Sequence, residues 1–176
     1  MSKPRKMLNN CDTPHIQALM RLIPTQSKPT VAKWAVAYAE CALLPLWEKY
    51  YPDDDRPRLS LHAARETIAG TLKWNTGLNA AAQACNAASA NAEDNPAPRA
   101  AARAIAQCSS AIHSASHALG LALYGALALA YDELGFSAPW PELEARAETE
   151  CGKMLAALKD IAVENEPKPC KTGWEC

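Results

Sequence analysis

Three consecutive aspartates meet two arginines in the octapeptide YPDDDRPR at residues 51–58. Carboxylates this close together could bind a hard cation, act as a general acid and base, contact a basic partner, or cap a helix. The octapeptide lacks the alternating ligand spacing and the glycine of a calcium loop, and no nucleophile or positioned histidine accompanies it. An aspartate placed before Arg56 and Pro57 can cap a following helix, whose first turn the proline favours. We therefore predict a structural loop in which Arg56 and Arg58 pair with the acids. Contact with a partner is the second hypothesis, and catalysis is the third.

Two histidines, His113 and His117, stand four residues apart in a segment that we expect to be helical. On an α-helix this spacing points both imidazoles in the same direction, as in helical zinc and iron sites. No glutamate follows His113 in the manner of the H-E-x-x-H motif, so a third ligand would have to come from another segment. The alternative is a polar seam, in which the histidines and the neighbouring serines hydrogen-bond to adjacent helices. We favour the polar seam and keep the metal pair as the alternative.

The elements that must position these residues are helices, because almost every segment between prolines has helical apolar spacing. In the second segment one apolar stripe runs at three- and four-residue steps, with a kink expected at Pro45; its residues are Val31, Trp34, Ala35, Tyr38, Ala42 and Leu46. The sequence has no strand pattern of useful length and no glycine-rich phosphate loop. Helical segments are expected over residues 13–24, 28–52, 56–74, 78–93, 99–134 and 137–166.

The longest of these segments, residues 99–134, contains no Asp, Glu, Lys or Arg from Ala104 to Tyr131. It is long enough to cross a membrane, but its glutamine, serine and histidine side chains lower its hydropathy, so we predict a buried central helix. Alanine dominates residues 79–130, which lets helix axes approach closely. The sequence predicts an all-α fold, a single-domain bundle of about six Ala-rich helices. Its expected parts are a flexible N-terminus at 1–11, the bundle at 12–166 and a flexible tail at 167–176.

Composition narrows the class of protein further. The chain has 176 residues and a net charge of −1 at pH 7, which argues against a nucleic-acid partner. Its first residues lack the apolar core of a signal peptide. Its 7 cysteines form no C-x-x-C pair, and several lie in Ala-rich runs where a free thiol packs as a small apolar group. We expect a reduced, cytoplasmic protein that holds no cofactor and no metal.

Several short motifs follow one another in a recognisable order. A Trp-Ala-x-x-x-Ala-Glu helix precedes the octapeptide, and Ala-Ala-Arg, a histidine, His-Ala-Leu-Gly and LALYGA come after it. These motifs stand at Trp34, Ala35, Ala39 and Glu40, at Ala63–Arg65, at His113, at His117–Gly120 and at residues 121–126. Over about residues 30–133 the chain thereby resembles a family of immunity proteins from bacterial polymorphic toxin systems, and the octapeptide is the most specific part of the resemblance.

The resemblance implies a protein that binds and neutralises a cognate toxin of the same bacterium by steric and electrostatic occlusion, without catalysis. Toxin nucleases often present basic clefts, which an acidic loop would meet with complementary charge. We then expect Asp53, Asp54 and Asp55 to contact the toxin and Arg56 and Arg58 to shape the loop. No nucleic acid or membrane is expected as a partner.

Two alternatives belong to other classes of protein. One is a helical metalloprotein that uses His113 and His117 as ligands. The other is a scaffold of unknown role that forms a homodimer, in which an aromatic residue such as Trp140 would be buried between two copies.

Overall fold

The computed structural model describes residues 4–92 and 94–174 of the chain. All regular structure in these residues is helical, and no strand occurs among them. Short 3-10 or π-helical turns adjoin the helices at residues 23–25, 39–43, 74–78, 115–119 and 121–126. The prediction of an all-α single-domain bundle is confirmed. Its α-helices are α1 (Pro14–Leu22), α2 (Lys28–Tyr38), α3 (Leu44–Tyr50), α4 (Arg56–Ile68), α5 (Asn79–Asn91), α6 (Pro96–Ser110), α7 (Leu127–Leu134) and α8 (Trp140–Ile161).

Helices α2 and α3 form one continuous rod that is widened at residues 39–43. In this π-helical turn the backbone N–H of Leu44 donates to the carbonyl of Ala39, five residues back. The cause lies at Pro45, which has no N–H and whose ring would clash with the carbonyl four residues back in an unbroken α-helix. The disturbance that the sequence predicted at Pro45 therefore takes the form of a π-helical turn just before the proline.

The segment at residues 99–134 was predicted as one helix, and this prediction was wrong, because the chain turns back after Ser110. The backbone N–H groups of His113 and Ser114 both donate to the carbonyl of Ser110, at 3.0 and 3.1 Å. The hydroxyls of Ser109 and Ser110 each donate to the carbonyl four residues back at 2.9 Å, a bond that competes with regular helix geometry. Helix α7 consequently packs against α6 instead of extending it.

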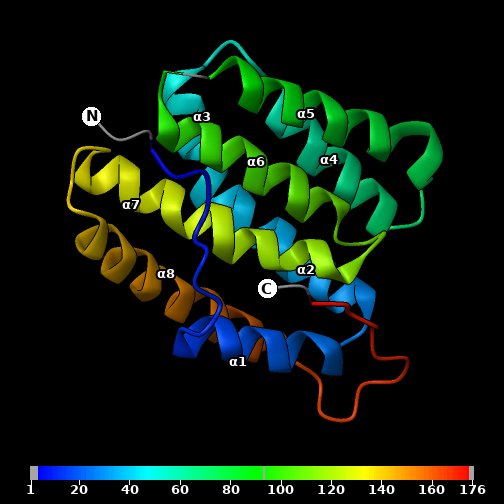
Figure 1. The fold of residues 1–176 in the computed structure, drawn as a ribbon. Helices are drawn as coiled ribbons and strands as arrows, with labels where there is room; N and C mark the ends of the chain where they lie inside the picture. The colour runs from blue at the N-terminus through cyan, green and yellow to red at the C-terminus, as the bar shows by residue number, and fades with distance from the viewer. Residues whose placement is uncertain (1–3, 93, 175–176) are drawn as a thin grey trace.

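Helix α6 is the centre of the bundle, and most of its residues are buried. It contacts α2, α3, α4, α5 and α7, and Figure 1 shows it between the α1–α8 side and the α4–α5 side of the molecule. Small residues allow the close approach that the alanine content predicted. At Gly120, a Cβ atom would lie only 2.6 Å from the Cβ of Gln107 on α6, so no larger residue fits there without a shift.

Both ends of the described chain pack along the helices. The backbone N–H of Leu8 donates to the carbonyl of Leu123 at 2.9 Å, and Leu8 is buried. At the other end, Cys170 is buried and its N–H donates to the carbonyl of Gln26 at 2.8 Å, while the indole of Trp174 donates to the carbonyl of Met20. These contacts show where the two segments lie, and their flexibility stays a prediction. The parts of both predicted tails at residues 1–3 and 175–176 lie outside the described residues.

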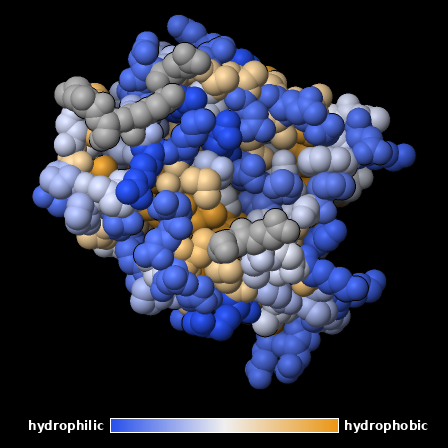
Figure 2. All heavy atoms as spheres, in the orientation of Figure 1, coloured by the Kyte–Doolittle hydropathy of each residue, from blue (hydrophilic) through white to orange (hydrophobic). Residues whose placement is uncertain are grey.

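The face shown in Figure 2 is largely hydrophilic, with apolar atoms exposed near its centre. Within the described part of the chain, no helix combines the length and the hydropathy that crossing a bilayer requires. The buried helix centre predicted from the uncharged run after Ala104 is present as the buried faces of α6 and α7.

Candidate functional site

The charged octapeptide forms the loop between α3 and α4, and its backbone is held from below by Trp47. The indole N–H of Trp47, a buried residue, donates to the carbonyl of Asp54 at 2.8 Å. The Trp47 ring stacks on Tyr51 with centroids 4.6 Å apart, and the N–H of Asp54 donates to the carbonyl of Tyr51 at 3.2 Å. The loop is therefore anchored to the core at its centre.

Asp54 binds Arg56 both through the backbone and through the side chain. Its Oδ1 accepts from the backbone N–H of Arg56 at 3.2 Å and from the Arg56 Nε at 2.8 Å, and its Oδ2 accepts from Nη2. The hydrogen bonds from the Arg56 guanidinium lower the pKa of the Asp54 carboxyl below its ordinary value. Asp55 occupies the position just before α4, but its side chain makes no capping bond. The sequence predicted an aspartate that caps the start of α4. Asp54 accepts the hydrogen bond there, and it lies one residue before the usual cap position, which Asp55 occupies.

Arg58 pairs with an acid outside the octapeptide. Its Nε and Nη2 donate to Oε1 of Glu48 on α3, at 3.0 and 2.6 Å. The prediction that Arg58 pairs with the three aspartates was wrong, because one turn of α4 carries its side chain across to α3. A second fork of the same kind joins Arg65 of α4 to Glu40 in the π-helical turn. Both pairs tie α4 to the α2–α3 rod and so fix where the loop begins and ends.

Asp53 and Asp55 are the two acids of the loop that remain on the surface. Both are exposed, and neither carboxylate makes a hydrogen bond or an ion pair with any described residue. The loop therefore presents two solvated negative charges on a backbone that Trp47, Asp54 and Arg56 hold in place. Such an arrangement can contact a basic surface.

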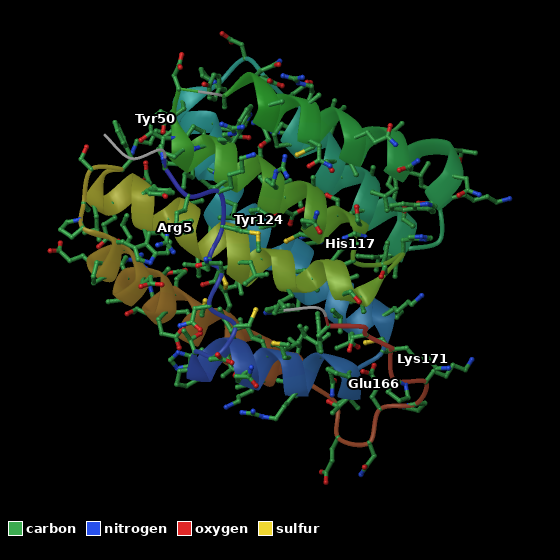
Figure 3. The ribbon with its side chains drawn as sticks, in the orientation of Figure 1. Arg5, Tyr50, His117, Tyr124, Glu166 and Lys171 are labelled. Carbon is green, nitrogen blue, oxygen red and sulfur yellow. The ribbon has the colours of Figure 1, made fainter. Side chains whose placement is uncertain are left out.

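The C-terminal end of α3 is also fixed to α7. Asp132 accepts hydrogen bonds from the hydroxyl of Tyr50 at 2.6 Å and from Nζ of Lys49 at 2.7 Å. Burial raises the pKa of Asp132, but the hydrogen bonds from Lys49 and Tyr50 outweigh it, so the net shift is downward. Tyr50, labelled in Figure 3, thus marks the end of the bundle where the acidic loop lies next to the end of α7.

The two candidate metal-binding histidines do not share a helix, contrary to the prediction. His113 lies in the turn after α6, where its ring stacks on Trp74 at 4.2 Å with a 7° angle between the planes. His117 follows in a 3-10 turn, and its Nδ1 lies 2.7 Å from Oε1 of Gln107. Burial, with a smaller contribution from His113, lowers the pKa of His117. Among the described residues, no three or more His, Cys, Asp or Glu side chains gather as a metal site.

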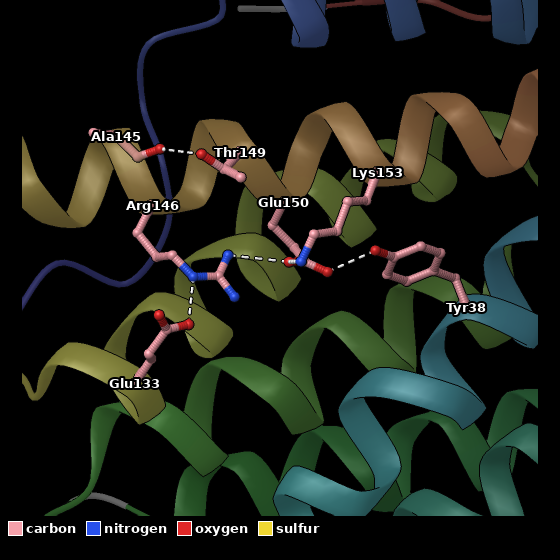
Figure 4. Close-up of polar contacts among 7 residues, drawn as sticks. All are labelled: Tyr38, Glu133, Ala145, Arg146, Thr149, Glu150 and Lys153. Atoms are coloured by element: carbon pink, nitrogen blue, oxygen red, sulfur yellow. Dashed lines mark hydrogen bonds and ion pairs between the residues drawn. The ribbon is translucent and has the colours of Figure 1, made fainter.

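A buried carboxylate that sequence reasoning did not single out lies where α8 meets α2 (Figure 4). The side chain of Glu150 is 6% exposed and accepts from the hydroxyl of Tyr38 at 2.6 Å, from Nη1 of Arg146 at 3.0 Å and from Nζ of Lys153 at 3.0 Å. Arg146 also donates to Glu133 at the end of α7, at 2.5 Å. The spacing of Glu150 from Arg146 and Lys153, four residues before and three after, was the available signal in the sequence.

The electrostatics of this cluster are those of a charged group stabilised by its neighbours. Burial raises the pKa of Glu150, whereas hydrogen bonds from Tyr38, Lys153 and Arg146 lower it, and the net shift is downward. Burial and the same hydrogen bond raise the pKa of Tyr38, so its hydroxyl stays protonated as a donor. The geometry of the cluster connects α2, α7 and α8.

Comparison with known proteins gives one informative match. The model of the family described as "Imm-5 like putative immunity protein" matches residues 21–157. The match is wider at both ends than the region of about residues 30–133 that the sequence motifs cover, and it includes most of α8 with Glu150. No curated protein and no solved structure matches the chain.

Proposed function

Because this chain belongs to the Imm-5 like immunity protein family, we propose that it binds a cognate bacterial toxin and neutralises it by occluding the surface on which the toxin acts. Membership in the family suggests an immunity function with a toxin as partner, and a role that is not catalytic. The binding surface that we propose is the α3–α4 loop, with Asp53, Asp54, Asp55, Arg56 and Arg58 as its residues.

The observation that supports this surface is that some residues of the octapeptide hold the loop in shape while two of its carboxylates remain exposed. Arg56 donates hydrogen bonds to Asp54, and Arg58 donates hydrogen bonds to Glu48, so these residues set the shape of the loop. The carboxylates of Asp53 and Asp55 are exposed and make no hydrogen bond or ion pair with any described residue. A fixed backbone that carries unused charges loses little conformational entropy when it binds.

Charge then determines which partners the loop favours. Two exposed carboxylates on one loop of a protein with a net charge of −1 attract a basic cleft and speed the encounter with it, and this attraction weakens as salt increases. The shape of the bundle would then block the toxin sterically, because a rigid helical body bound over the toxin's cleft excludes the toxin's substrate. No bond is made or broken by the immunity protein in this mechanism.

The test uses the toxin encoded beside this protein and the double variant Asp53→Asn, Asp55→Asn. We expect the variant to keep its helical circular dichroism and melting temperature, because these two carboxylates are exposed and make no hydrogen bond or ion pair within the described fold. We also expect its Kd for the toxin to rise by about tenfold or more, equivalent to about 1.4 kcal/mol. Growth protection during co-expression should fall in parallel.

The matched control is Asp160→Asn, Glu164→Gln, which removes two exposed acids near the end of α8. It changes net charge by the same amount and should leave Kd within about twofold, because these acids lie outside the proposed binding surface and salt screens the interactions of solvent-exposed charges. If the loop variant protects cells as well as the unmodified protein does, the α3–α4 loop is not the binding surface.

A further inference from the structure

A cavity of about 280 Å³ opens where the N-terminal segment passes the start of α6. Three separate parts of the chain build it: the N-terminal segment, the first turns of α6 together with Asp94 two residues before that helix, and the loop after α7. The lining residues are Pro4, Arg5, Lys6, Asp94, Pro96, Arg99, Ala100, Arg103 and Phe136.

The lining carries four cationic side chains and one carboxylate, Asp94, a surplus of 4 − 1 = 3 positive charges among the described residues. None of the four cations forms an ion pair within the described chain. Arg99 and Arg103 are one helical turn apart on α6, so both guanidinium groups project on the same side. Among the described residues, the positive charge of this cavity is therefore concentrated and only partly balanced by Asp94.

Two of these cations are held in place by aromatic rings instead of by acids. The guanidinium of Arg5 lies 4.0 Å from the ring centroid of Trp140 and donates to Asn9 at 3.1 Å, and that of Arg103 lies 5.9 Å from the ring of Tyr124. Figure 3 shows Arg5 and Tyr124 on the face that the N-terminal segment crosses. A ring fixes a guanidinium in position and leaves its N–H donors available to an anion.

The contrast with other arginines of the molecule is informative. Arg56, Arg58, Arg65 and Arg146 each bind a carboxylate directly. Like charges confined together in a partly enclosed space repel one another, and this repulsion is relieved when an anion binds between them. The four cations at the cavity are thus arranged as a receptor for an anion more than as a set of surface ion pairs.

The backbone N–H groups of Ala97 and Arg99 at the start of α6 are already hydrogen-bonded, so side chains must donate the hydrogen bonds to an anion. Pro96 and Pro98 have no N–H, the N–H of Ala97 donates to Oδ1 of Asn95, and the N–H of Arg99 donates to the Asn95 carbonyl. The positive end of the helix dipole adds to the local potential, but direct donors must come from the arginines and the lysine. Guanidinium groups bind phosphate oxygens in pairs, which makes phosphate the anion that this set fits best.

The remaining wall of the cavity is apolar. Phe136 is 52% exposed, two residues after α7, next to Gly135 whose φ of 80° turns the chain at this point. An exposed phenyl ring beside these four cations can stack on a flat organic group. The ligand would then carry a phosphate at one end and an aromatic ring at the other.

We infer that this cavity binds a small phosphate ester of the mononucleotide type. Arg99 and Arg103 bind the phosphate, Arg5 and Lys6 complete the positive surface around it, and Phe136 contacts the base. None of the lining residues belongs to the acidic loop, so this site goes beyond the toxin-binding surface proposed above.

The test is isothermal titration calorimetry with sodium phosphate and with adenosine 5′-monophosphate, at constant ionic strength set by sodium chloride. We expect both probes to bind, the nucleotide more tightly than phosphate, and both more weakly as sodium chloride increases. Arg99→Ala with Arg103→Ala should weaken both probes by about tenfold for each arginine removed, because each loses charge-assisted hydrogen bonds. Phe136→Ala should weaken the nucleotide several-fold and leave phosphate unchanged.

The matched control, Arg21→Ala with Lys159→Ala, removes two exposed cations from other helices and should leave both affinities unchanged. The inference fails if neither probe binds, or if the double arginine variant binds them as well as the control does. Equal affinity for phosphate and nucleotide, insensitive to Phe136→Ala, would overturn the mononucleotide assignment. Binding of a DNA oligonucleotide without binding of either small probe would show a polyanion surface and would also refute the proposal.

Discussion

Replacing Glu150 by glutamine removes a buried negative charge and keeps the size of the side chain. The carboxylate accepts three hydrogen bonds at 2.6 to 3.0 Å and is 6% exposed, so water cannot take the place of its partners. The hydroxyl of Tyr38 loses a charged acceptor, which costs about 1.5 kcal/mol or more. Arg146 keeps Glu133, so its loss is smaller, about 1 to 1.5 kcal/mol, and the exposed Lys153 contributes at most about 0.5 kcal/mol.

The sum is a loss of about 3 kcal/mol in the free energy of unfolding. For a chain of this length, that corresponds to a fall in melting temperature of about 6 to 12 °C. Urea unfolding followed by tryptophan fluorescence measures the free energy directly. Lys153→Ala serves as the control and should change stability by no more than about 0.5 kcal/mol.

A double-mutant cycle isolates the buried contact within the cluster. Tyr38→Phe alone should cost about 1.5 kcal/mol, and the pair Tyr38→Phe, Glu150→Gln should cost less than the sum of the single variants by about 1 kcal/mol. If Glu150→Gln is as stable as the unmodified protein within about 0.5 kcal/mol, the reasoning that treats this carboxylate as a connector of α2, α7 and α8 is refuted.

The same variant gives the pH dependence its sign. The folded-state pKa of Glu150 is lowered from an ordinary value of 4.5, so its contribution is complete above that value and is lost as the pH falls through the lowered pKa. The stability difference between the unmodified protein and Glu150→Gln should therefore be constant near neutral pH and shrink in acid below about pH 4.5. A difference that grew on acidification would contradict this assignment of charge.

Three further outcomes are expected. Gly120→Ala should destabilise the fold by about 1 to 3 kcal/mol in urea unfolding, because its Cβ would meet the Cβ of Gln107, an atom close to the backbone of α6, and an unchanged midpoint would contradict this contact. Asp54→Ala should cost about 1 kcal/mol and speed amide hydrogen exchange at the start of α4, as it removes the acceptor there; unaltered exchange would show that the loop is held by other means. The exposed thiol of Cys41 should react with iodoacetamide in the native protein. Cys85 is buried, and burial raises its pKa to about 12, so it should react only after unfolding. Peptide mass mapping would show which thiols are modified.

Much of the fold could be predicted from local pattern. Helical apolar spacing located most of the helices, since a periodicity of about 3.6 residues is a property of neighbouring residues. Pro45 predicted a disturbance between α2 and α3, because the missing N–H of a proline removes a hydrogen bond from the helical turn in which it lies. The break at residues 111–114 was not predicted, because an uncharged alanine- and serine-rich run contains no residue that indicates where the chain turns back.

The candidate site divides along the same line. The sequence by itself determined the helical class, the charged octapeptide and the resemblance to an immunity protein family, since all of these depend on the order of residues along the chain. Only the tertiary structure decided that Arg58 pairs with Glu48, that His113 and His117 face different neighbours, and that Arg5 meets the cations of α6. The physical reason is distance along the chain: an ion pair, a ring stack or a cavity between remote segments depends on how whole helices pack, and no local periodicity records that.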